Sequence, residues 1–168
     1  MNKERDALPA IIYVTNTIRL TRYQHPPNTA LNWYQDMETV FLVDGRRERY
    51  DETKLNGMYT YLNEHMALYI IEVLEAGTFL PIGDVAFSED DLPIVIGDVA
   101  YRQKGIGKQV ILAIIEQAKK CGYSSLGVKT IYFYNVASQK LFESIGFVKQ
   151  GESENGFSYA LDLNNHTL

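Results

Sequence analysis

The sequence predicts an α/β (α+β) domain in which helices cover both faces of a mixed, mostly antiparallel central sheet. Three observations predict this class. Helix-like segments do not alternate regularly with strands, because several of them precede a run of three strand-like segments. The links between those three strands are short, which favours antiparallel neighbours. The length of 168 residues suits one domain. We expect that domain over residues 10–164, after a charged tail at residues 1–9.

The first third of the chain combines one interrupted strand with helices. Residues 10–23 are rich in Ile, Val, Thr and Tyr and predict a strand, with an interruption near Asn16. A short helix is expected from Asn28 or Thr29 to Gln35, and another over residues 36–42. Residues 51–65 predict a longer helix, because apolar residues recur there at intervals of three and four.

The middle of the chain predicts three strands and an amphipathic helix. The strands cover residues 67–74, 78–87 and 92–100, and they are separated by a glycine turn and an acidic turn. A buried stripe over residues 109–121 indicates a helix, and Gly122 supplies the left-handed conformation that ends it.

The last part of the chain predicts strand, helix and hairpin. Residues 125–133 predict a strand, and Asn135 can cap a helix that ends at Gly146. Residues 147–151 and 157–163 predict two final strands, because an Asn-Gly pair lies between them and favours a tight turn.

Composition excludes several function classes. The net charge of −5 argues against a general nucleic-acid surface. A single cysteine, Cys121, excludes an internal disulfide and fits a reducing, cytoplasmic location. The three histidines show no metal-ligand spacing, so we expect no metal. No apolar stretch is long enough for a membrane span, and the charged N-terminus does not resemble a signal peptide.

The turn before the amphipathic helix predicts an anion site. It reads Tyr-Arg-Gln-Lys-Gly-Ile-Gly-Lys over residues 101–108 and leads from a strand into a helix. Free N–H groups and the positive end of the helix dipole favour phosphate there. Gly105 and Gly107 let the backbone approach a ligand closely. A dinucleotide fingerprint fails because Val110 replaces its third glycine, and a P-loop fails because Gln109 replaces its Ser or Thr.

The pattern Arg-x-x-Gly-x-Gly at residues 102–107 resembles the acyl-CoA pyrophosphate loop of the GCN5-related N-acetyltransferases. A second motif of that family follows at the expected spacing. Asn135 opens a helix, a small residue, Ser138, lies three positions later, and Gly146-Phe147 ends it. Ser138 and the opening Ile-Arg-Leu at residues 18–20 are most similar to the ribosomal-protein N-terminal (RimJ/RimL-like) acetyltransferases.

The resemblance implies acetyl transfer from acetyl-CoA to a primary amine by direct attack in a ternary complex. It also implies a splay between strands four and five, here residues 92–100 and 125–133. The backbone N–H of Ile94 would face the thioester oxygen, and Ile96 would pair with the pantetheine amides. Pro93 has no N–H and fits a local disruption of the sheet.

The resemblance implies the following cofactor-binding residues: Ile94, Ile96, Arg102, Gln103, Lys104, Gly105, Ile106, Gly107, Lys108, Asn135, Ser138 and Phe142. Many relatives have a tyrosine acid at the position of Phe142, and Ser138 is the alternative acid here, with solvent as the other choice. Some relatives place a glutamate base on strand four, where Pro93, Ile94 and Val95 stand in this sequence. The base would therefore come from Glu72, Asp84 or a water chain.

Two other functions remain open. A regulatory domain could bind CoA without turnover, because the tyrosine acid and the strand-four acid are both missing. The chain could also bind the phosphate of another nucleotide at the same anion site, although the dinucleotide and P-loop motifs both fail. The acceptor is a protein N-terminus or a small-molecule amine, with no nucleic acid and no membrane as partner. The chain is expected to be a monomer or a homodimer.

Overall fold

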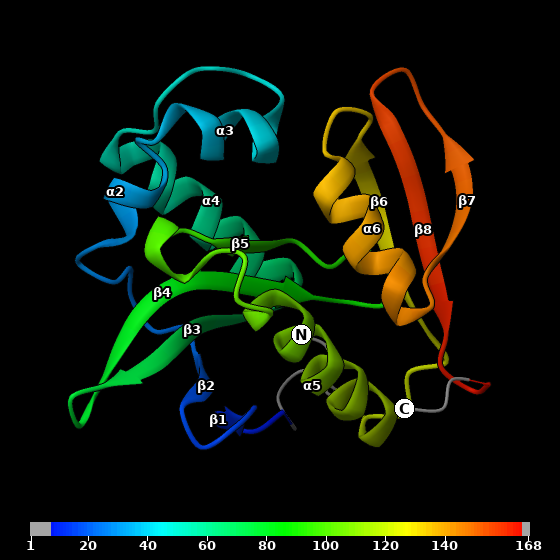
Figure 1. The fold of residues 1–168 in the computed structure, drawn as a ribbon, viewed down its shortest axis with the longest axis horizontal. Coiled ribbons are helices and arrows are strands. Elements are labelled where there is room, and N and C mark those ends of the chain that lie inside the picture. The colour runs from blue at the N-terminus through cyan, green and yellow to red at the C-terminus, as the bar shows by residue number, and fades with distance from the viewer. Residues whose placement is uncertain (1–7, 166–168) are drawn as a thin grey trace.

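Two antiparallel sheets carry the fold, and the computed structural model describes residues 8–165. The strands are β1 (Ile11–Tyr13), β2 (Ile18–Arg22), β3 (Ala67–Glu75), β4 (Thr78–Phe87), β5 (Ile94–Ile96), β6 (Ser125–Tyr132), β7 (Val148–Glu152) and β8 (Gly156–Asp162). The five-stranded sheet has the order β1-β2-β3-β4-β5, and the three-stranded sheet has the order β6-β8-β7. Figure 1 shows the second sheet standing apart, on the right of the view.

The helices follow the predicted order. They are α2 (Ala30–Trp33), α3 (Met37–Asp44), α4 (Glu52–His65), α5 (Ile106–Lys120) and α6 (Val136–Ile145), with a 3-10 turn η1 at Val99–Tyr101. Asp36 and Asp51 cap α3 and α4 by accepting from the backbone N–H of the residue three positions later. The α/β class, the interrupted first strand and the final hairpin are confirmed. Of the expected tail at residues 1–9, residues 1–7 lie outside the described residues.

The mostly antiparallel pairing and the splay between residues 92–100 and 125–133 are confirmed. Every pairing in the described sheets is antiparallel, and β5 and β6 do not pair, so the strands form two sheets. Two element bounds differ from the predictions. The strand expected at residues 92–100 shortens to β5, since Pro93 has no N–H and the chain turns into η1 after Gly97. Helix α5 begins at Ile106 instead of residue 109, directly after left-handed Gly105.

The five-stranded sheet buries both of its faces. Alternate residues of β3 point to opposite sides, so Tyr69 and Ile71 join the core beneath α5 while Leu68 joins a second core with α4. Helices therefore cover both faces, as the sequence predicts. The second core includes Trp33 of α2, whose ring packs where Gly97 lacks a side chain. A Cβ at Gly97 would lie only 2.2 Å from the indole.

A buried carboxylate joins two helices to β4. The hydroxyl groups of Tyr34, at the end of α2, and Tyr59, in α4, both donate to Oδ2 of Asp84, at 2.7 and 2.8 Å. Asp84 is only 3% exposed. Burial raises its pKa to about 6, although the two hydroxyl donors act in the opposite direction.

We expect Asp84 to make stability depend on pH. Its pKa is higher in the folded chain, about 6, than the value near 4 of an unfolded aspartate. Its contribution is therefore complete below about pH 4 and is lost as the pH rises through about 6. Relative to Asp84→Asn, the unfolding free energy of the wild type should fall by about 3 kcal/mol over that window in urea titrations.

The matched control is Asp90→Asn, because Asp90 is exposed in the turn after β4. It should track the wild type at every pH. A difference between wild type and Asp84→Asn that is the same at all pH values would contradict the assignment.

Candidate functional site

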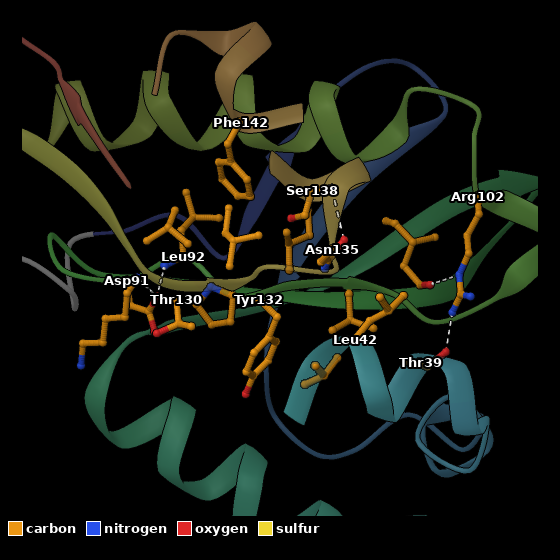
Figure 2. Close-up of a pocket in the computed structure, with 18 residues that line it drawn as sticks. Thr39, Leu42, Asp91, Leu92, Arg102, Thr130, Tyr132, Asn135, Ser138 and Phe142 are labelled. Atoms are coloured by element: carbon orange, nitrogen blue, oxygen red, sulfur yellow. Dashed lines mark hydrogen bonds between the residues drawn. The ribbon is translucent and has the colours of Figure 1, made fainter. Parts of the chain in front are cut away.

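A cavity of about 450 Å³ lies where the two sheets separate. Residues of four segments (39–43, 91–96, 128–132 and 135–142) and Arg102 enclose the cavity. Its lining residues are Thr39, Leu42, Val43, Asp91, Leu92, Pro93, Ile94, Val95, Ile96, Arg102, Val128, Lys129, Thr130, Ile131, Tyr132, Asn135, Ser138 and Phe142. Figure 2 shows side chains from β6, α3 and α6 converging on it. Its walls are mostly apolar, with a few polar groups, as is usual for a small-molecule site.

One end of the gap between the sheets is tied. The carboxylate oxygen Oδ1 of Asp91 accepts from the backbone N–H of Leu92 at 3.1 Å and from that of Lys129 at 3.0 Å. The strand segments beyond this tie do not hydrogen-bond to each other. The gap is therefore a wedge that opens from Asp91 toward Ile96 and Tyr132.

The exposed edge of β5 presents to the gap backbone groups that bond to no neighbouring strand; of these, the Ile96 carbonyl accepts from Arg102. The bonds from Ala86 N–H to the Pro93 carbonyl and from Gly97 N–H to the Ile82 carbonyl mark hydrogen-bonded pairs of β4 and β5. Pairs alternate in an antiparallel ladder, so Ile94 and Ile96 occupy positions whose N–H and C=O point away from β4. These are the two residues for which the sequence predicts backbone contacts with a thioester and a pantetheine arm.

Helix α6 brings three predicted residues to the cavity. The Asn135 side chain caps the helix by accepting from Ser138 N–H at 3.2 Å. In Figure 2 the Ser138 side chain points toward the cavity, and Phe142 approaches it from the next turn. The Ser138 hydroxyl has no hydrogen-bond partner in the described part of the chain, whereas Ser144 donates to the Leu141 carbonyl of its own helix at 2.7 Å. Ser138 is thus free to act on a ligand.

The predicted phosphate loop has free backbone donors. Within residues 8–165, no N–H group of residues 103–108 donates to another described residue. The first bond of α5 runs from Gln109 N–H to the Gly105 carbonyl, at 3.2 Å. Gln103 and Gly105 have positive φ angles of 58° and 77°, which turn the chain into the helix. No acidic residue stands in the first turn of α5 to compete with an anion.

Within the predicted phosphate loop, Arg102 lines the cavity and residues 103–108 do not. Ile106, Gly107 and Lys108 begin α5 after the N-cap Gly105. A Cβ added at Gly107 would find only the Leu141 side chain, at 3.6 Å, so open space adjoins this position. Arg102 differs from its neighbours, because its guanidinium enters the cavity and contacts α3.

The proposed bases lie away from the cavity lining. Glu72 on β3 accepts from Nε of Arg19 on β2 at 2.7 Å, and this ion pair occupies its carboxylate. Asp84 is covered by Tyr34 and Tyr59. Among the described residues, Asp91 is the only carboxylate that lines the cavity, and it already accepts two backbone bonds. The geometry therefore favours a water chain among the three predicted bases.

Sequence patterns missed the α3 side of the cavity. Thr39, Leu42 and Val43 form this wall, and no motif marks them because their position depends on how α3 packs. Tyr132 of β6 was missed as well, although the alternation of its strand offers a signal. Neither a cluster of three potential metal ligands nor a helix long and apolar enough to cross a bilayer is found in residues 8–165.

Comparisons with solved structures find the same fold. A domain from Methanocaldococcus jannaschii superposes with a TM-score of 0.73 at 22% identity, covering 86% of this chain and 97% of the other. A Salmonella typhimurium acetyltransferase that modifies the N-terminal serine of ribosomal protein L7/L12 has a TM-score of 0.66, 17% identity and coverages of 90% and 98%. Spermidine N-acetyltransferase from Vibrio cholerae, in complex with CoA and spermine, has a TM-score of 0.67, 14% identity and coverages of 89% and 98%.

A search of curated proteins finds no significant sequence match. A family model does match, and it covers residues 28–147. That range includes α3, the wedge between β5 and β6, the loop before α5 and all of α6. It also contains both motifs that resemble the family in sequence. The chain therefore belongs to the acetyltransferase (GNAT) family.

Proposed function

We propose that this chain transfers the acetyl group of acetyl-CoA to a primary amine by direct attack in a ternary complex. The observation that carries the proposal is the open edge of β5. Ile94 presents its backbone N–H and C=O, and Ile96 its N–H, to a cavity that is otherwise mostly apolar, while the Ile96 C=O accepts from Arg102. Such an edge can bind an extended chain bearing amides, because it offers the bonds of an added strand.

The two ends of the cofactor would meet different parts of the chain. The free N–H groups of residues 103–108 suit a diphosphate at the positive end of the α5 dipole. Lys104 and Lys108 add positive charge there. Asn135, Ser138 and Phe142 would line the thiol end, opposite Ile94. The residues present therefore fit acetyl-CoA, which supplies an activated thioester.

The chemistry follows from these positions. The acceptor nitrogen attacks the thioester carbon, the new C–N bond forms and the C–S bond breaks. Ile94 N–H donates to the carbonyl oxygen as negative charge develops on it. No cysteine lines the cavity, which supports direct transfer without an acyl-enzyme. Orientation in such a complex is worth on the order of 7 kcal/mol or more of the barrier.

Two protons must move during the reaction. The nitrogen loses one to water, because the described cavity holds no unoccupied carboxylate. The departing sulfur takes one from the Ser138 hydroxyl, which faces the cavity without a protein partner. Phe142 has no proton to supply. Ser138 regains its proton from solvent after the thiol leaves.

The acceptor is a protein N-terminus or a small-molecule amine. Both kinds occur among proteins of this fold, since one similar structure modifies an N-terminal serine and another is a spermidine acetyltransferase. The alternative function is a regulatory domain that binds CoA without turnover, which the replacement of the tyrosine acid by Phe142 and the lack of a carboxylate base in the described cavity favour. Thiol release from acetyl-CoA across a panel of peptides and polyamines separates the two. Binding without release on every acceptor would support the regulatory domain.

We expect Gly107→Glu to lower CoA affinity at least about 100-fold, because its carboxylate would repel a diphosphate at the loop. Gly107 has ordinary helical backbone geometry and open space beside it, so the fold should survive. Isothermal titration with CoA measures the effect. Gly57→Glu is the matched control, because Gly57 is exposed on α4 with open space beside it, and it should bind CoA within about threefold of wild type. Undiminished affinity in Gly107→Glu would refute the phosphate assignment.

We expect Ser138→Ala to lower kcat about 10- to 100-fold while CoA affinity stays within about threefold, because a general acid contributes mainly in the transition state. Steady-state kinetics with an acceptor identified in the panel, together with CoA titration, measure both values. Ser144→Ala is the control, since this serine bonds within its own helix. Unchanged kcat in Ser138→Ala would assign the proton to solvent.

A further inference from the structure

Arg102 connects its own loop to two other elements, β5 and α3. Its Nε donates to the Ile96 carbonyl at 2.8 Å, and one terminal nitrogen donates to the Thr39 hydroxyl at 2.6 Å. The other terminal nitrogen lies 3.9 Å from Oδ2 of Asp36. Figure 2 shows the side chain reaching from the loop before α5 to Thr39 on α3. The guanidinium thus joins that loop, the edge of β5 and the first turn of α3.

The partner of Arg102 on α3 is built into the protein. Thr39 is only 2% exposed, and its hydroxyl donates to Oδ2 of Asp36 at 2.6 Å. Asp36 caps the helix by accepting from Thr39 N–H at 3.2 Å. The hydrogen bond from the Thr39 hydroxyl lowers the pKa of Asp36, and the nearby charge of Arg102 acts in the same direction. The network therefore contains an ionised carboxylate, a buried hydroxyl and a guanidinium.

The second turn of α3 contacts the link that follows β6 of the three-stranded sheet. Tyr134, in the link between β6 and α6, stacks on Phe41 with ring centroids 4.3 Å apart. Its hydroxyl donates to the Phe41 carbonyl at 2.6 Å. Helix α3 therefore spans the gap, with Arg102 at Thr39 in its first turn and Tyr134 at Phe41 in its second. Leu42 and Val43, which follow Phe41, form a wall of the cavity.

We propose that Arg102 is a positioning residue that sets α3 across the open wedge. The α3 wall of the cavity, which the proposed cofactor contacts leave to the acceptor amine, is thereby placed by the same loop that receives the diphosphate. This inference rests on the proposed function. Arg102 therefore acts through Thr39 and Ile96, and phosphate binding falls to the backbone N–H groups and the lysines. The sequence motif alone predicts the opposite role, a cation beside the phosphate.

The test compares variants at the two ends of the contact. Thr39→Val keeps the size of the side chain and removes the hydroxyl, whereas Thr39→Ser keeps the hydroxyl. Arg102→Gln removes the charge. Glu38→Gln is the control on α3, because Glu38 pairs with Arg47 at the surface and does not touch Arg102. Each variant is measured for CoA affinity by titration, for the acceptor KM and kcat, and for amide exchange of residues 37–44.

We expect Thr39→Val and Arg102→Gln each to raise the acceptor KM about tenfold, with faster exchange in α3, while CoA affinity stays within about threefold. The double variant should be no worse than either single variant, because both remove one contact. Thr39→Ser and Glu38→Gln should match wild type. A raised acceptor KM with unchanged CoA affinity, together with wild-type behaviour of Thr39→Ser, would distinguish a positioning role of Arg102 from a general loss of structure.

Two results would overturn the inference. One is a CoA affinity that falls tenfold or more in Arg102→Gln while Thr39→Val behaves as wild type, because this pattern would make Arg102 a phosphate ligand. The other is unchanged α3 exchange in both variants. Failure of the wild type to bind CoA would instead refute the proposed function, and the exchange measurement would still decide whether Arg102 positions α3.

Discussion

The site depends on the absence of backbone pairing between β5 and β6. Each strand pairs on its outer side with its own sheet, and the edges that face one another remain open. Asp91 ties the wedge at one end by accepting from both Leu92 and Lys129. A sheet closed along its full length would satisfy the N–H and C=O groups of Ile94 and Ile96 and leave no space between the strands.

The wedge needs support that a continuous sheet would not need. On one side, α5 and α6 pack on each other beneath the strands. On the other side, α3 extends from Arg102 to Tyr134 and is held by polar and aromatic contacts. Asp84 fixes α2 and α4 to the neighbouring strand through Tyr34 and Tyr59. Most of the described polar contacts around the cavity therefore position secondary structure elements.

Much of this arrangement can be predicted from the sequence, because it follows from local patterns. Helix periodicity, caps and the Asn-Gly turn predicted most elements, and the two motifs predicted the loop and α6. Tertiary contacts decided the rest. The roles of Glu72 and Arg102 depend on Arg19 and Thr39, which lie far from them in sequence. Trp33 packs where Gly97 lacks a side chain, and no local pattern indicates this contact.

The placement of α3 has a second effect, on association between molecules. An open strand edge invites pairing with another polypeptide, and proteins usually cover or charge such edges. Here two edges face the same gap, and the residues of α3 that line it stand over both. Helix α3 thus covers the open edges of β5 and β6 while leaving room for a narrow ligand. Without this cover, the strand edges that form the binding site would also favour aggregation.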